Sequence, residues 1–137
     1  MADALGRYTQ IASLCLALIP GSQAQNVAGQ LQITGTWRGN SECAVKNSAC
    51  HDETNVYRFS EIATRLGWFS GTGSKLVNGK EISMGALDWK YDAESHVLES
   101  NNARRTFRFV VNDDKIEGTL FLPDGRVYRR IHLTKMK

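Results

Sequence analysis

Beyond about residue 30, apolar and polar residues alternate along the chain, and clusters of turn-forming residues interrupt the alternation at short intervals. A period of two places successive side chains on opposite faces of a β-strand. Short strands separated by turns at this spacing are typical of an all-β sandwich or barrel. The pattern predicts strands at 31–39, 54–62, 84–91, 96–100, 104–112, 116–122 and 126–135.

The segment 64–83 is less regular. Gly67, Gly71 and Gly73 weaken the strand pattern and predict bulges or sharp bends. Asn78-Gly79 is a strong signal for a tight hairpin turn. Trp68 and Phe69 are neighbours, so they face opposite sides of a strand, and we expect one of them at an exposed rim.

Short connections favour the pairing of strands that follow each other in the sequence, which gives an up-and-down meander. Closing such a meander removes its exposed strand edges. With the irregular segment included, the chain supplies eight strands. An eight-stranded barrel has an interior that side chains nearly fill or that holds one small ligand. The sequence therefore predicts a single eight-stranded antiparallel up-and-down β-barrel.

The same alternation predicts which side chains face the interior of the barrel. In the first strand, the inward set is Leu31, Ile33, Gly35 and Trp37. Aromatic residues fall on the inward face of several later strands: Tyr57, Phe59, Trp89, Tyr91, Phe107 and Phe109. These aromatic residues either fill the core of a small domain or line a pocket for a small apolar ligand.

The N-terminal segment has the layout of a secretory signal. Arg7 precedes a short apolar run at 11–19, and the small residues Ser22 and Ala24 suit the −3 and −1 positions of a cleavage site. The apolar run is shorter than the roughly 20 residues that span a bilayer. An uncleaved anchor and a lipid attached to Cys15 are the alternatives.

This layout divides the chain into a signal peptide (1–24), a polar leader (25–30) and a barrel domain (31–137). It predicts an exported protein, periplasmic or extracellular, with no transmembrane segment in the mature chain.

Two cysteines remain after the signal segment, Cys43 and Cys50. In an oxidising compartment the simplest interpretation of such a pair is a disulfide. Closing a loop this short stabilises the fold by about 2.5 kcal/mol. Zinc binding by the same cysteines with His51 and Asp52 is the alternative, but the cysteine spacing is wider than in structural zinc sites.

Composition and charge narrow the possible functions. The chain has 137 residues, enough for one domain, and a formal net charge of +3. No dense Lys/Arg cluster of the kind that binds nucleic acid is present. His51, His96 and His132 lie in separate predicted elements, and Asp113-Asp114 is typical of a turn. We therefore expect no catalytic site, no metal and no cofactor.

The Gly35-Thr36-Trp37 sequence at the first strand, followed by a meander with an arginine in its last strand, resembles the calycin superfamily (lipocalins and related barrels). The resemblance implies that Trp37 packs across one end of the barrel against a basic residue of the final strand. Arg129 is the expected partner because it shares the inward face of that strand, and a slip in register would substitute Arg126 or Arg130. The chain lacks the second lipocalin motif and the C-terminal helix, which implies a small cavity or none.

The chain also resembles small periplasmic inhibitors of bacterial metalloproteases, which are barrels of similar size with a Gly-x-Trp start and one disulfide. That resemblance implies that an N-terminal segment, here 25–30, enters a protease cleft.

From these observations we expect an exported, non-catalytic protein that binds a small hydrophobic molecule. A barrel that binds a protein partner, such as a protease, is the first alternative. A structural envelope protein without a pocket is the second.

Overall fold

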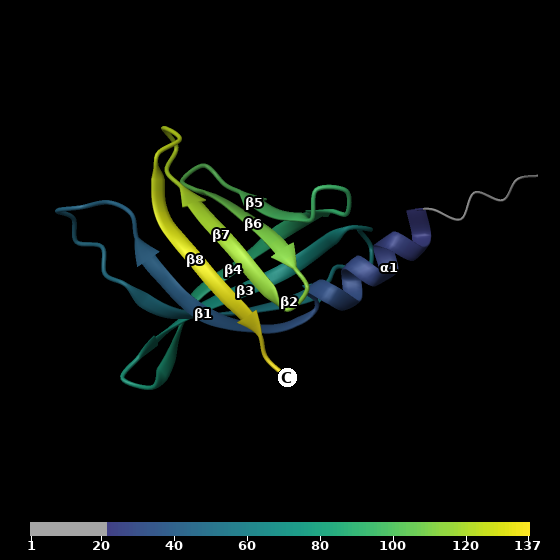
Figure 1. Ribbon diagram of the computed structural model, residues 1–137, viewed down its shortest axis with the longest axis horizontal. Helices are drawn as coiled ribbons and strands as arrows, with labels where there is room; N and C mark the ends of the chain where they lie inside the picture. Colours follow the sequence, from purple (N-terminus) through teal and green to yellow (C-terminus); the bar gives the residue numbers. More distant parts are fainter. Residues whose placement is uncertain (1–21) are drawn as a thin grey trace, which may run out of the picture.

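The computed structural model describes residues 22–137, so most of the predicted signal segment lies outside the described residues (Figure 1). One helix precedes eight strands. The elements are α1 (Ser22–Ile33), β1 (Gly35–Cys43), β2 (Glu53–Glu61), β3 (Trp68–Val77), β4 (Lys80–Asp92), β5 (Val97–Asn101), β6 (Thr106–Asn112), β7 (Lys115–Phe121) and β8 (Val127–Lys135).

The strands form a closed barrel in which each pairs with its neighbours in the sequence, and β8 pairs with β1. All eight pairings are antiparallel. The predicted eight-stranded up-and-down barrel is therefore confirmed. This architecture is consistent with a lipocalin-like fold.

The prediction of a strand from residue 31 is wrong, because helix α1 continues to Ile33 and β1 begins at Gly35. The Thr34 N–H still donates to Gln30 O at 3.0 Å, as in a helical turn. Leu31 is 71% exposed, whereas Ile33 is fully buried. The two-residue spacing of Leu31 and Ile33 fits one face of a strand, but only Ile33 packs into the barrel. Gln and Ala around them favour a helix.

The irregular segment 64–83 forms most of a long hairpin. Asn78 and Gly79 form its turn with φ angles of 51° and 77°, as the tight hairpin turn requires. The register between β3 and β4 shifts at Gly73/Ser74, which confirms the predicted irregularity. Phe69 is buried, whereas Trp68 is partly exposed with the Arg65 guanidinium 3.7 Å from the centre of its ring.

The barrel has two different ends (Figure 1). We call the end next to α1 the closed end; it also carries the β2–β3, β4–β5 and β6–β7 connections. The open end carries the β1–β2 loop, the β3–β4 turn and the β5–β6 and β7–β8 connections. The buried core fills the closed end and the middle of the barrel, and its largest members are Trp37, Trp89, Phe69 and Phe109.

Candidate ligand-binding cavity

A cavity of about 370 Å³ lies inside the open end of the barrel. This volume is near the lower limit of small-molecule sites, which span about 300–1,000 Å³. Its apolar lining comes from five strands: Tyr57, Met84, Leu87, Trp89, Phe107, Leu120 and Ile131. Its polar lining is Ser41, Glu53, Asn55, Asn102, Arg104, Arg105 and Arg129.

The aromatic lining packs as one cluster with the core. The Trp89 and Phe107 ring centroids are 5.3 Å apart, and those of Trp89 and Phe109 are 4.8 Å apart. Tyr57 meets Phe109 edge to face, with centroids 5.4 Å apart. Rings held by several such contacts lose little further freedom when a flat apolar molecule packs against them, which lowers the entropic cost of binding.

The six aromatic residues predicted as ligand contacts do not all reach the cavity. Tyr57, Trp89 and Phe107 line it. Phe59 and Phe109 are buried in the core beside them but do not line it. Tyr91 belongs to the closed end, where its ring packs against Gly29 of α1 and its hydroxyl lies 3.2 Å from His96 Nδ1. Inward orientation was predicted correctly, but position along the barrel axis decides which rings face the cavity.

Trp89 lies against a strand position without a side chain. A Cβ on Gly71 would come within 2.4 Å of Trp89 Nε1 and 2.6 Å of a Phe59 ring carbon. Both rings therefore occupy the space that a larger residue would need. Trp89 Nε1 is buried and has no hydrogen-bond partner among the residues that the structure describes. The Phe59 and Trp89 rings are nearly perpendicular, with centroids 5.3 Å apart.

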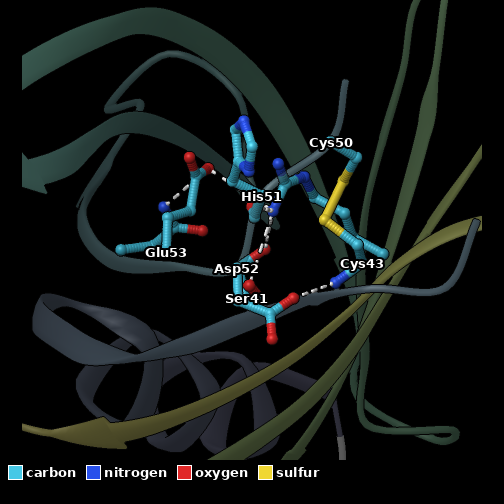
Figure 2. Close-up of polar contacts among 8 residues, drawn as sticks. Ser41, Cys43, Cys50, His51, Asp52 and Glu53 are labelled. Carbon is cyan, nitrogen blue, oxygen red and sulfur yellow. Dashed lines mark hydrogen bonds and ion pairs between the residues drawn. A yellow bond between two sulfur atoms is a disulfide. The ribbon is translucent and has the colours of Figure 1, made fainter. Parts of the chain in front are cut away.

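Arg129 ties three segments together beside the cavity, and Figure 2 labels its partners Ser41, His51 and Glu53. Its Nη1 donates to Ser41 Oγ in β1 at 3.2 Å and to His51 O in the β1–β2 loop at 3.0 Å. Glu53 Oε1 of β2 lies 3.7 Å from the same nitrogen. The arginine side chain is only 11% exposed, so its charge needs these partners. This cluster fixes the β1–β2 loop against the wall of the barrel.

The Cys43–Cys50 disulfide is present and closes the same loop, with the two Cα atoms 6.0 Å apart (Figure 2). Asp52 Oδ1 accepts a hydrogen bond from Cys43 N at 2.8 Å. The disulfide and this bond together hold the His51 carbonyl where Arg129 reaches it. The prediction of a disulfide rather than a zinc site is confirmed at these cysteines.

Tyr57 lies on the same side of the cavity as this cluster. Burial raises the pKa of its hydroxyl well above the usual value, and the charge of Glu53 raises it further, while Arg129 opposes the change. The hydroxyl is therefore neutral in the folded protein throughout the physiological range and can donate or accept a hydrogen bond.

The prediction that Arg129 stacks on Trp37 is wrong, because the two residues lie at opposite ends of the barrel. Trp37 pairs with Lys135, whereas Arg129 pairs with Cys43. Lys135 Nζ lies 5.6 Å from the centre of the Trp37 ring system and donates to Leu31 O and Gln32 O at 3.0 and 2.9 Å. Burial lowers the pKa of Lys135.

Trp37 itself does close the barrel end, as expected. It is fully buried, and its Nε1 donates to Ile33 O at 2.9 Å. The expected basic partner on the last strand is thus present, but it is a lysine six residues further along than predicted. Of the alternative partners, Arg130 pairs with Glu42 and Arg126 precedes β8, so neither pairs with Trp37.

Within residues 22–137, no three His, Cys, Asp or Glu side chains gather as metal ligands would. Over the same residues, no helix is long and apolar enough to cross a membrane. His51, His96 and His132 lie in three separate places, as their sequence positions indicate: the β1–β2 loop, the β4–β5 turn and β8.

Sequence reasoning missed the polar half of the cavity. Glu53 and Asn55 have the inward parity of Tyr57, and Arg105 has that of Phe107, so strand alternation could have found all three. Nothing in the sequence indicated that Ser41 would lie beside Arg129, because that contact depends on the register between β1 and β8.

No protein-family model matches this chain, and no curated protein is similar enough to indicate a relative. The function must therefore be argued from the cavity itself.

Proposed function

We propose that the protein is an exported, non-catalytic binding protein of the lipocalin-like type, which takes a small hydrophobic molecule into the open end of its barrel. The observation that carries this proposal is the cavity of about 370 Å³ with Tyr57, Trp89 and Phe107 along its apolar side. Concave, mostly apolar sites with a few polar groups are the usual form of small-molecule sites. The Cys43–Cys50 disulfide supports export to an oxidising compartment, either the periplasm or the outside of the cell.

The proposal is tested with a neutral dye, N-phenyl-1-naphthylamine, which fluoresces more strongly in an apolar site. The full-length chain, purified without detergent and with its disulfide formed, should show saturable binding of one dye per protein. Native mass spectrometry of the same sample would detect a co-purified ligand of a few hundred daltons by its loss on denaturation.

A pair of variants locates the binding. Gly73 lines the cavity, and a Cβ there would lie 3.2 Å from the Tyr57 ring, so Gly73→Leu fills the cavity with a small shift of that ring. Thr72→Leu makes a similar change on the exposed face of the same strand. Gly73→Leu should abolish dye binding and Thr72→Leu should preserve it. Absence of saturable binding to the wild-type protein, or equal binding by both variants, would refute the proposal.

A protein-binding role is the second candidate, and the edge of β4 favours it. β4 pairs with β5 only over Lys90–Asp92, which leaves the stretch from Lys80 to about residue 87 paired on one side only. Ile82 and Met84 on that stretch are 46% and 47% exposed. Such an edge can take an added strand from another protein.

An inhibitor-like N-terminal segment has less support. Residues 25–30 lie within α1, and Gly29 is buried against Tyr91, so the segment would have to unwind before it could enter a protease cleft. At the edge of β4, the Leu76–Glu81 pair alternates with hydrogen-bonded pairs of the β3–β4 ladder, so the Glu81 N–H points away from β3. Proline at Glu81 would remove that backbone donor from the open edge. A partner that adds a strand there should then dissociate, while dye binding in the cavity should be unchanged.

A further inference from the structure

The mouth of the cavity carries more positive than negative charge. Three arginines line it, Arg104, Arg105 and Arg129, against a single carboxylate, Glu53. Glu53 lies 3.7 Å from Arg129. Among the residues that the structure describes, no carboxylate lies within 4.0 Å of the guanidinium of Arg104 or Arg105.

Two of these arginines are brought to the same aromatic ring. The guanidinium carbon of Arg105 lies 5.0 Å from the centre of the Tyr128 ring, and that of Arg129 lies 5.5 Å from it. The ring offers each cation a favourable contact. It does not neutralise either charge, and neighbouring like charges raise each other's energy. An anion between the ring and the cavity would relieve that repulsion.

Three hydrogen bonds fix the backbone of the loop that presents Arg104 and Arg105. Asn102 Oδ1 accepts hydrogen bonds from both Arg104 N and Arg105 N at 2.9 Å, and Asn102 N donates to Arg105 O at 3.0 Å. A backbone fixed in this way leaves only side-chain freedom to lose on binding.

We infer that the ligand of this cavity carries an anionic group, such as a carboxylate, which pairs with Arg105 at the mouth while its apolar body lies against Trp89 and Phe107. This inference rests on the proposed binding function and adds the chemical class of the ligand. The charge of Arg129 contributes to the same positive field, but its Nη1 is engaged by Ser41 and the β1–β2 loop. Arg105 is therefore the residue that distinguishes an acid from a neutral molecule of the same shape.

The test uses two probes of nearly identical shape, 1-naphthaleneacetate and its neutral amide 1-naphthaleneacetamide. Their dissociation constants are measured by calorimetry on the full-length chain near neutral pH. A charge-assisted hydrogen bond to the exposed Arg105 guanidinium predicts that the acid binds about tenfold more tightly than the amide. That preference should shrink as salt is raised, because salt screens the arginine charges.

Arg105→Gln should remove most of the preference for the acid over the amide. Arg108→Gln is the matched control, since it removes the same charge from the exposed face of β6, three residues further along, and lies outside the cavity lining. The acid-to-amide ratio is measured within each variant, so partial loss of folded protein does not alter it. If Arg105→Gln fails to fold, the wild-type ratio and its decrease with salt still decide the question.

Equal binding of the two probes, or a ratio that Arg105→Gln leaves unchanged, would overturn the inference. In that case the neutral dye would still bind, and the proposed function would stand. If neither probe binds and the dye does not bind either, the cavity is not a ligand site and both proposals fail.

Discussion

Replacing Trp37 with alanine should destabilise the protein more than any other single truncation at the closed end. The side chain is fully buried, and its Nε1 donates a hydrogen bond to Ile33 O. Truncating a buried tryptophan to alanine typically costs about 3–5 kcal/mol. Loss of the indole donor also leaves the Ile33 carbonyl without that partner, which costs about 1–3 kcal/mol if it stays buried. These two costs together exceed the truncation range, but relaxation of the closed end around the missing indole offsets part of them. We therefore expect Trp37→Ala to lose about 4–5 kcal/mol.

Urea unfolding followed by far-ultraviolet circular dichroism measures this loss without relying on tryptophan fluorescence. Trp68→Ala is the matched control. Trp68 is only partly buried, and its main partner is the Arg65 guanidinium stacked on its ring. A cation–π contact near the surface contributes about 0.5–1 kcal/mol, so this variant should lose only about 1–2 kcal/mol in total.

Trp37→Phe divides the effect further, because it keeps an aromatic ring but removes the N–H donor. It should lose about 1–2 kcal/mol, between the wild type and the alanine variant. A loss below 1 kcal/mol for Trp37→Ala, or losses that match those of Trp68→Ala, would show that Trp37 does not close the barrel as described. The interpretation of the closed end would then be refuted.

Three further predictions concern the two ends of the barrel. Burial raises the pKa of Tyr57, so above about pH 10 the unfolded chain releases the hydroxyl proton while the folded protein retains it. The free energy of unfolding should therefore fall by about 1.4 kcal/mol per pH unit in that range. In urea unfolding at rising pH, Tyr57→Phe should lack this fall, and equal pH dependence of the two proteins would contradict the prediction. Gly71→Ala should lose about 1–3 kcal/mol in the same assay because its methyl group would overlap the Trp89 ring, whereas a neutral or stabilising effect would mean that the ring moves freely. Lys135→Met should lose about 1–2 kcal/mol of stability, because the lysine ammonium group binds two carbonyls at the C-terminal end of α1. Lys137→Met removes a charge from an exposed position and should have no measurable effect.

The sequence predicted the barrel because a closed sheet with one solvent face imposes a strict period of two. β4, β6 and β8 show this most clearly: the residues predicted inward, such as Trp89, Phe109 and Ile131, are buried. The disulfide was predictable for a different reason, since the two cysteines that follow the predicted signal segment leave one simple pairing. Both inferences need only local information.

Parity gives the face of a strand but not the height along the barrel, and the error over Arg129 shows the difference. Arg129 and Lys135 have the same parity, so both were compatible with the inward face of the last strand. They lie six residues apart, which is about 20 Å along a strand. Only the register between β1 and β8, set by contacts distant in sequence, places Lys135 beside Trp37. The prediction that Tyr91 lines the cavity was wrong for the same reason, because parity does not give the height of a residue along the barrel.

The prediction of where the first strand begins was wrong for another reason. The spacing of Leu31 and Ile33 fits a strand, but it fits equally well a helix whose last residue, Ile33, packs into the barrel. Two residues are too few to distinguish these patterns. The outcome depends on the closed end, where Lys135 and Trp37 bind the last carbonyls of α1. Those partners come from parts of the chain that local patterns do not connect.

The cavity exists because the inward side chains are smaller at the open end than at the closed end, and not because of the number of strands. At the closed end these positions hold bulky side chains such as Trp37 and Phe69, whereas at the open end they include Gly73, Ser41 and Asn55. A barrel selected only for stability could place larger apolar residues there, because filling an internal cavity usually stabilises a fold. Gly73→Leu separates the two explanations. Greater stability with loss of dye binding would mean that the space serves a ligand, while greater stability with no change in binding would make it a packing defect.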